Sequence, residues 1–434
     1  MTSPREQREF FAVRTVGEAL AGFRPARRTG TERVALEDCL GRIPAEPVGA
    51  PHALPGFARA TVDGFAVRAS DTYGVSDGQP GYLDLAGEAR MGRPPDAALR
   101  PGAAIAIATG APLPPGADAV VKIEHTQSTL PGLIEVVRPA TPGEGMVRED
   151  EDAAAGAELA RPGRPLRAAD LGMLAAAGVT EVLVCARPRV AIVSTGDELV
   201  PRESAELETG QVRDSTAPAL GALVREAGGE PSFAGIVPDD REALEAALRR
   251  ALAGREAAAA AASGTAGDAP ARATRGCDLL VVSAGSSVGA RDETASAVAS
   301  LGEPGIWCHG LALRPGKPTL LAECGGVPVI GLPGNPRSAL VVFRLVGIPL
   351  VRLVGGCIEA PPEPSAHARL ARDLPSSAGR LDVVQVSLDE GLATPLFGSS
   401  ALLSILAQAD GYLVVPESAT GLPAGAEVEV TLYR

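Results

Sequence analysis

The chain has 434 residues, 45% of them hydrophobic and 21% charged, which are ordinary proportions for a soluble globular protein. At about 150 residues per domain, this length predicts roughly three domains. The net charge of −13 and the 3% aromatic content argue against a nucleic-acid partner, which needs a basic surface or an aromatic stacking platform.

Targeting and metal-site signals are weak. No stretch reaches the roughly 20 apolar residues of a membrane-spanning helix, and the first ten residues lack the apolar core of a signal peptide. The six cysteines lie at least 16 residues apart and form no CxxC pair, so neither a zinc site nor a thioredoxin-type motif is predicted. We expect a cytoplasmic protein with free thiols and no membrane partner.

The first half of the chain indicates a mixed region interrupted by a β lobe. A helix is predicted over 16–23, with Thr15 as its cap, and a strand over 33–36. Residues 51–152 contain short apolar runs between Gly/Pro turns, which is typical of a small all-β lobe. These runs are 65–67, 104–107, 119–123 and 133–137. A helix at 168–177 and a strand at 181–185 follow.

Strands alternate with helices beyond residue 188, which predicts βαβ units and a largely parallel sheet. The expected strands are 189–194, 232–237, 278–283 and 327–332, and the expected helices are 215–227, 240–252, 294–301 and 337–354. Ligands of such sheets bind beyond the carboxyl ends of the strands. Residues 253–275 are low-complexity Ala/Gly/Ser and are interpreted as a solvated, mobile insertion.

The C-terminal part begins with a Pro-rich linkage near residue 358. Short alternating strands follow at 383–386, 411–415 and 426–432. This pattern favours a β-barrel or a sandwich of about 75 residues.

Two loops at the predicted sheet edge could bind anions. In STGDEL (194–199), one of the two carboxylates, Asp197 or Glu198, could hold Mg²⁺ while amides of the turn face a phosphate, but a plain turn with a helix cap explains the residues equally well. The loop 283–292 offers two glycines and three serines as an anion-binding nest, with Asp292 at the helix start. A flexible loop capped by Asp292 is the alternative, and the anion site is favoured. The loop is not a Walker A motif.

Other candidates are weaker alone. Arg314 and Lys317 flank a turn and could pair with phosphate or another oxyanion, although a solvated basic turn is the simpler explanation. The turn 331–336 could bring backbone close to a ligand, or only reverse the chain. Asp239 and Asp240 are most simply helix caps. Asp63 and the turn containing Thr109 have the character of ordinary β-lobe turns.

Taken together, nine motifs resemble the molybdopterin molybdenumtransferases, that is, MoeA-type enzymes and the gephyrin E domain. They occur in family order over nearly the whole chain. The motifs are xVDGFAV (61–67), ATGAPLPPGADAVV (108–121), GxxLxxxDLGMLAAAGV (163–179), STGDEL (194–199), VPDDREAL (237–244), SAGSSVGxxD (283–292), RPGKP (314–318), GLPGNPxSA (331–339) and ADGYLVVPES (409–418). Any one is weak, but nine in order are highly specific.

The resemblance implies a multidomain fold with four parts. These are an elongated mixed α/β dimerisation region (1–50 with 153–186), a β lobe (51–152), a central doubly wound α/β molybdopterin-binding domain (187–357) and a C-terminal β-barrel (358–434). It also implies a homodimer whose cleft lies between the α/β domain of one subunit and the β lobe of the other.

The implied reaction is the insertion of molybdate, or tungstate, into adenylyl-molybdopterin, with release of AMP and a requirement for Mg²⁺. A molybdopterin adenylyltransferase would act upstream as a partner. Phosphates and a dianion demand donors and cations in the cleft. By this resemblance, Asp63 and Thr109 face the substrate, and Glu198 and Asp292, with Asp240, serve the metal or polarise the attacking group. The remaining implied binding residues are Gly196, Gly285, Ser286, Ser287, Gly289, Arg314, Lys317, Pro333, Gly334, Asn335 and Ser400, with Ser399 as the alternative to Ser400.

The chain departs from the usual family pattern at several positions. Val147 and Gly310 replace basic residues, Asp150 replaces a glycine and adds negative charge, and Ala284 and Ser286 alter the serine loop. Two other functions are weighed against metal insertion. An adenylyltransferase uses a related α/β domain, but usually alone, whereas three further regions are present here. A non-catalytic molybdopterin-binding or scaffold protein is supported only by the departures.

Overall fold

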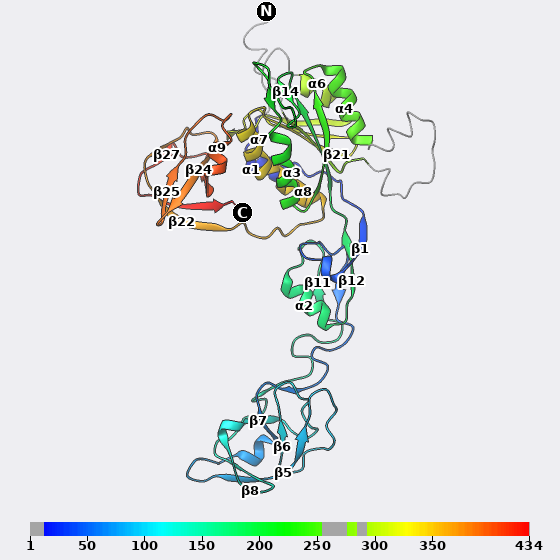
Figure 1. Cartoon of the computed structure of the whole chain (residues 1–434), viewed down its shortest axis with the longest axis vertical. Coiled ribbons are helices and arrows are strands. Elements are labelled where there is room, and N and C mark those ends of the chain that lie inside the picture. The colour runs from blue at the N-terminus through cyan, green and yellow to red at the C-terminus, as the bar shows by residue number, and fades with distance from the viewer. Residues whose placement is uncertain (1–12, 254–275, 284–292, 434) are drawn as a thin grey trace, which may run out of the picture.

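The computed structural model describes residues 13–253, 276–283 and 293–433. The chain is elongated: a β lobe lies at one end, an α/β domain and a barrel lie at the other, and a small mixed region lies between them (Figure 1). Over the described ranges, no helix has both the length and the apolar character needed to cross a membrane. The predicted insertion lies outside these ranges except for Ala253.

The β lobe is built on a six-stranded sheet of order β7-β4-β6-β5-β9-β8. Its strands are β4 Gly64–Val67, β5 Gly81–Ala89, β6 Ala103–Ile107, β7 Ala119–Lys122, β8 Thr126–Leu130 and β9 Leu133–Val136. Two apolar clusters fill the lobe, one around Ile105 and Val120 and the other around Leu83 and Val121. β3 (Arg59–Ala60) precedes β4 in the chain, and β10 (Met146–Val147) follows β9. These two strands form a separate antiparallel pair. The all-β prediction is confirmed.

The mixed region joins the lobe to the α/β domain by paired chain segments. Its elements are β1 Thr31–Ala35, β2 Val48–Gly49, β11 Glu158–Ala160, α2 Ala168–Ala176 and β12 Glu181–Cys185. β1 runs antiparallel to β12, and β2 runs antiparallel to β11. Helix α1 (Val16–Gly22) begins with the predicted cap at Thr15, in a reciprocal capping box with Glu18. Although residues 1–50 were assigned to the elongated region, α1 packs into the core of the α/β domain.

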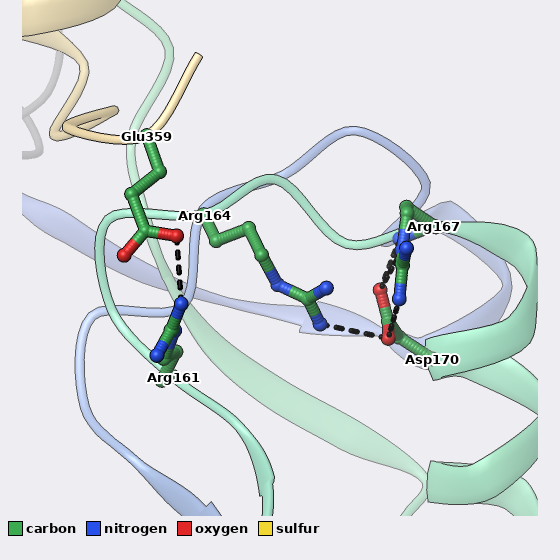
Figure 2. A network of polar contacts seen from close by, with 5 residues as sticks. All are labelled: Arg161, Arg164, Arg167, Asp170 and Glu359. Atoms are coloured by element: carbon green, nitrogen blue, oxygen red, sulfur yellow. Dashed lines mark hydrogen bonds and ion pairs between the residues drawn. The ribbon is translucent and has the colours of Figure 1, made fainter. Parts of the chain in front are cut away.

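Figure 2 shows the polar contacts at the start of α2 and one ion pair to the chain segment that leads to the barrel. Arg164 and Arg167 both contact the Asp170 carboxylate, at 2.8 and 3.2 Å, and Arg161 contacts Glu359 at 2.7 Å. Only 9% of the Asp170 side chain is exposed, whereas Arg161 and Glu359 are each half-exposed. Because exposed ion pairs contribute little, Asp170 is the stabilising member of the network.

We expect Asp170→Asn to lower the free energy of unfolding by about 1–3 kcal/mol, because two arginines lose a shared carboxylate. Burial raises the pKa of Asp170, but hydrogen bonds from Arg167 and Arg164 outweigh it and leave the pKa lowered. The carboxylate therefore stabilises the fold above pH 3.8, the ordinary value, and this contribution is lost as the pH falls below that value. Urea unfolding across this range should show the two proteins converging at low pH. Glu359→Gln is the control and should change stability by less than about 1 kcal/mol.

The α/β domain contains a six-stranded sheet of order β16-β13-β17-β21-β20-β18. The first four strands in this order are parallel to one another. β20 runs antiparallel to β21, and β18 runs antiparallel to β20. The bounds are β13 Arg189–Thr195, β16 Glu230–Val237, β17 Leu279–Ser283, β18 Pro304–His309, β20 Leu320–Cys324 and β21 Val327–Leu332. β13, β17 and β21 are continuous buried apolar runs, as expected of strands that are covered on both faces.

Helices cover both faces of this sheet, which confirms the doubly wound architecture. Residues of α3 (Thr216–Glu226), α7 (Pro336–Val342) and α8 (Ile348–Val354) share one core with α1. Residues of α4 (Arg241–Ala253) and α6 (Glu293–Ala299) form the other. From β13 the chain moves outward to β16 and then returns to β17 on the other side of β13. The gap between β13 and β17 is therefore the switch point, where such folds bind ligands.

The helix predicted over 337–354 is divided in the structure. α7 is followed by a π-helical turn, Phe343–Gly347, and then by α8. Pro349 lies in the first turn of α8 and has no backbone N–H to donate to the preceding turn. A local change of helical register at this point accommodates the proline.

The C-terminal region is a closed five-stranded barrel, with β24 paired to both β25 and β26. The strands are β22 Ser365–Leu370, β24 Leu381–Asp389, β25 Leu392–Pro395, β26 Gly411–Val415 and β28 Glu427–Leu432, and α9 spans Ser404–Gln408. The short pair β23 (Leu374–Pro375) and β27 (Gly421–Leu422) adjoins them. β19 (Leu313–Arg314), from the α/β domain, pairs with β24 and joins the two domains.

Candidate functional site

The carboxyl ends of β13 and β16 bring several polar side chains together. Ser194 donates a hydrogen bond to Asp214 at 2.7 Å, and Thr195 donates one to Asp239 at 2.8 Å. Asp197 accepts from the Asp239 backbone N–H at 3.0 Å. These contacts tie the loops after β13 and β16 to each other, so most of the polar groups here already have partners within the protein.

Glu198 is the exception at this edge. Its carboxylate makes no hydrogen bond or ion pair with the described residues, and a methyl group on Gly196 would lie only 2.8 Å from one of its oxygens. Because Gly196 has no side chain, there is room close to the turn for the Glu198 carboxylate, whose oxygens are potential metal ligands. Asp240 caps α4 by accepting from the Ala243 N–H at 2.8 Å, as predicted for a helix cap.

The serine loop expected to cradle phosphate lies outside the described residues. The predicted residues concerned are Gly285, Ser286, Ser287, Gly289 and Asp292, together with the departure Ala284. Among the residues that are described, no group of three or more His, Cys, Asp or Glu side chains could hold a metal ion. Of the two predicted metal ligands, Glu198 and Asp292, the described residues include Glu198 alone.

A cavity of about 910 Å³ lies where the α/β domain meets the barrel. Its wall contains five residues implied by the resemblance: Arg314, Lys317, Pro333, Asn335 and Ser400, with Ser399 beside them. They come from three segments: the turn after β19, the turn after β21 and the barrel loop before α9. Gly334 belongs to the second turn but is not part of the cavity wall.

The cavity wall is cationic although the whole chain carries a charge of −13. It has four cationic side chains and one carboxylate, a formal charge of +3. The carboxylate, Asp382, accepts from Arg380 at 3.0 Å and from Ser376 at 2.9 Å, and lies 3.4 Å from Arg314. Its charge is thus shared by two arginines. Lys317 and Arg337 have no carboxylate partner within the described ranges.

Arg337 was not predicted as a site residue. It occupies the x of GLPGNPxSA, is only 8% exposed, and donates through Nη1 to the Gly398 carbonyl at 2.9 Å. Burial lowers the pKa of its guanidinium; Tyr433 opposes this shift, and the neighbouring Arg314 adds to it. In the sequence, this residue begins an apolar helix, and no local pattern marks it as a cavity residue.

Asp63 and Thr109 lie together in the β lobe, far from the cavity of their own chain (Figure 1). The Thr109 N–H and hydroxyl donate to Asp63 Oδ1 at 2.7 and 3.0 Å. These two hydrogen bonds, the backbone one first, lower the pKa of Asp63. The lobe therefore presents an exposed carboxylate whose ionised form is favoured.

Two of the departures lie at positions with positive φ, and a third lies in a β ladder. Gly310 has φ +123°, a backbone conformation that favours glycine, while its carbonyl accepts from the Arg14 N–H at 3.1 Å. Asp150 has φ +65°, which aspartate tolerates better than most residues. Val147 pairs with Arg59 in the β3–β10 ladder.

Family models match almost the whole chain. The MoeA N-terminal region (domain I and II) matches residues 13–178, the probable molybdopterin binding domain matches 191–267 and 256–353, and the MoeA C-terminal region (domain IV) matches 367–433.

Similar proteins agree with these models. Molybdopterin molybdenumtransferase 2 of Mycobacterium tuberculosis is 33% identical over 96% of this chain and 97% of its own length. Molybdopterin molybdenumtransferase of Bacillus subtilis is 32% identical over 93% and 90%. A crystal structure of the molybdopterin biosynthesis MoeA protein from Pyrococcus horikoshii OT3 aligns with a TM-score of 0.78 at 29% identity, covering 97% of this chain and all of that one. The chain therefore belongs to the MoeA family of molybdopterin molybdenumtransferases, enzymes of molybdenum cofactor biosynthesis.

Proposed function

We propose that the protein inserts molybdate into adenylylated molybdopterin and releases AMP, using the cavity between the α/β domain and the barrel. The observation that carries this proposal is the charge of the cavity, +3 in a chain of −13. Its substrates are anionic, and in a partly enclosed cavity such charges act more strongly than in open water. Arg314 and Lys317 bind the oxyanions, and Ser399 or Ser400 donates hydrogen bonds from the barrel side.

The phosphates of the nucleotide lie across the switch point in this proposal. The turn at Gly196 and the loop containing Gly285, Ser286, Ser287 and Gly289 supply backbone and hydroxyl donors to them. The turn of Pro333, Gly334 and Asn335, of which Pro333 and Asn335 line the interdomain cavity, brings backbone close to the pterin in this proposal. Asp240 contributes by keeping the start of α4 in position through its cap.

Glu198 fits the role of a magnesium ligand, together with Asp292. Its carboxylate has no partner among the described residues and stands beside the Gly196 turn, and Mg²⁺ is commonly held by one or two carboxylates plus substrate phosphates. When bound, Mg²⁺ would supply positive charge that offsets the negative charge of the phosphates. The protein's own part is to hold the Glu198 carboxylate beside the Gly196 turn, after β13.

The reacting cleft is completed in a homodimer, with the β lobe of the partner subunit over the cavity. Asp63 and Thr109 are remote from the cavity of their own chain, so a second copy is the simplest way for them to act on the same substrate (Figure 1). The ionised Asp63 then orients or deprotonates a reacting group. A molybdopterin adenylyltransferase supplies the substrate.

A cytoplasmic location follows from the thiols in this proposal. None of the six cysteines forms a disulfide, and five of them are buried. Free thiols persist in reducing compartments. The net charge of −13 argues against a nucleic-acid partner.

The test is reconstitution with purified protein, adenylyl-molybdopterin and Mg²⁺, with molybdate or tungstate in parallel. AMP release coupled to active cofactor is expected, and the more effective oxyanion identifies the metal. Tight nucleotide binding without AMP release would contradict the proposal and favour a carrier or scaffold. Omitting Mg²⁺ while adding a chelator is the matched control.

A further inference from the structure

We infer that Arg337 is a further oxyanion-binding residue in the wall of the interdomain cavity, beside Arg314 and Lys317, and that its charge is stabilised mainly by a bound tetrahedral oxyanion. This inference rests on the proposed function and deepens it. The starting observation is that Arg337 is 92% buried and lines the cavity, yet no carboxylate pairs with it among the described residues.

The hydrogen bonds of Arg337 are also incomplete. Its guanidinium has five N–H donors, and Nη1 donates to the Gly398 carbonyl at 2.9 Å. Nε is buried and has no hydrogen-bond partner. A neutral carbonyl cannot balance a buried positive charge, so the ligand-free protein carries an unfavourable electrostatic cost at this position.

The neighbouring charges add to this cost. Burial is the main cause that lowers the pKa of Arg337, Tyr433 partly offsets it, and Arg314 lowers it further. The Asp382 carboxylate is already bound by Arg314 and Arg380. Lys317, on the same wall, adds another cation. A dianion in the cavity removes the repulsion and supplies acceptors that the guanidinium lacks.

The position of Arg337 connects oxyanion binding to the contact between the α/β domain and the barrel. It lies in the first turn of α7, its N–H donates to the Ser400 carbonyl at 3.2 Å, and its side chain donates to Gly398 in the same barrel loop. An oxyanion bound at this point therefore touches both sides of the junction. Free molybdate or tungstate and the phosphate of molybdopterin share this chemistry, and different probe anions distinguish them.

The test compares wild type with Arg337→Met, which keeps the length of the side chain and removes the charge. Molybdate, tungstate, phosphate and AMP are each titrated by calorimetry, and Tm is measured with and without each anion. We expect Arg337→Met to bind the preferred oxyanion about ten- to a hundredfold more weakly and to lose most of the rise in Tm that the anion causes. Without anion, its Tm should equal or exceed that of wild type, because an uncompensated buried charge is gone. Arg337→Lys should retain part of the affinity.

If Arg337 had a purely structural role, Arg337→Met would lower Tm without anion and leave the oxyanion affinity unchanged. If Arg337→Met melts earlier without anion and binds as tightly as wild type, the inference is wrong while the proposed function stands. If wild type binds none of the free oxyanions yet releases AMP in the reconstitution, the inference alone fails. If neither binding nor AMP release occurs, both fail. Arg352→Met changes the net charge equally but lines a different cavity, and it should leave the oxyanion affinity within about twofold of wild type.

Discussion

A heterodimer of two inactive variants is expected to recover about half of the wild-type activity, because one of its two clefts is intact in a two-fold symmetric dimer. One chain carries Asp63→Asn, and the other carries Arg314→Ala with Lys317→Ala. If the cleft joins the β lobe of one subunit to the cavity of the other, one cleft receives both lesions and the other receives none.

Each parent should be nearly inactive for a different reason. Asp63→Asn removes the ionised carboxylate that Thr109 holds, and losing a group that acts in proton transfer costs about 10²–10⁴-fold in kcat. Arg314→Ala with Lys317→Ala removes two exposed cations from the cavity wall and weakens oxyanion binding, with about ten- to a hundredfold lost per charged contact. Both sets of side chains are exposed, so folding should be preserved.

The measurement is AMP release by heterodimers isolated through two affinity tags, with each parental homodimer as a control. A heterodimer as inactive as its parents would mean that Asp63 and the cavity do not act in one intersubunit cleft. Half activity would establish both the dimer and the partner lobe. The design follows from the shape of the chain: the β lobe lies at the opposite end from the α/β domain and the barrel (Figure 1), whose residues line the cavity.

Much of the fold could be predicted from the sequence because buried strands leave a strong local pattern. The strands at 181–185, 327–332 and 411–415 have the predicted bounds, since each is an apolar run that ends at a turn. β5 was missed because most of Gly81–Ala89 is exposed and includes Gly, Asp and Glu. β18 was missed because it begins with proline and is only partly buried.

The cavity could be predicted only in part. Resemblance to a family identified Arg314, Lys317 and Ser400 as candidates, but nothing local in the sequence brings residue 314 beside residue 382. The pairing of β19 with β24 does so, across two domains. Arg337 could not be identified because its significance lies in the absence of a counter-charge around a buried guanidinium. That property belongs to the packed structure.

Gly64→Ala is expected to disrupt the β lobe, lowering its stability by more than about 3 kcal/mol. Gly64 lies in β4, opposite Lys122 of β7 and next to Asp63. A methyl group there would lie 1.9 Å from the Val121 carbonyl oxygen and 2.9 Å from its carbon. Both atoms are backbone, so the two strands must separate. Gly78→Ala, in the same lobe, meets no atom within 4 Å and should be nearly neutral.

Limited proteolysis and thermal unfolding would locate the damage. Cleavage within residues 51–152 should appear in Gly64→Ala and not in Gly78→Ala, and an unchanged lobe would contradict the close approach of β4 and β7.

Gly64→Ala also tests the intersubunit cleft without changing Asp63. Its α/β domain and barrel share no core with the lobe, so its cavity should stay intact. Paired with the chain that lacks Arg314 and Lys317 but has a sound lobe, it should regain activity, because the required lobe and the required cavity then come from different chains.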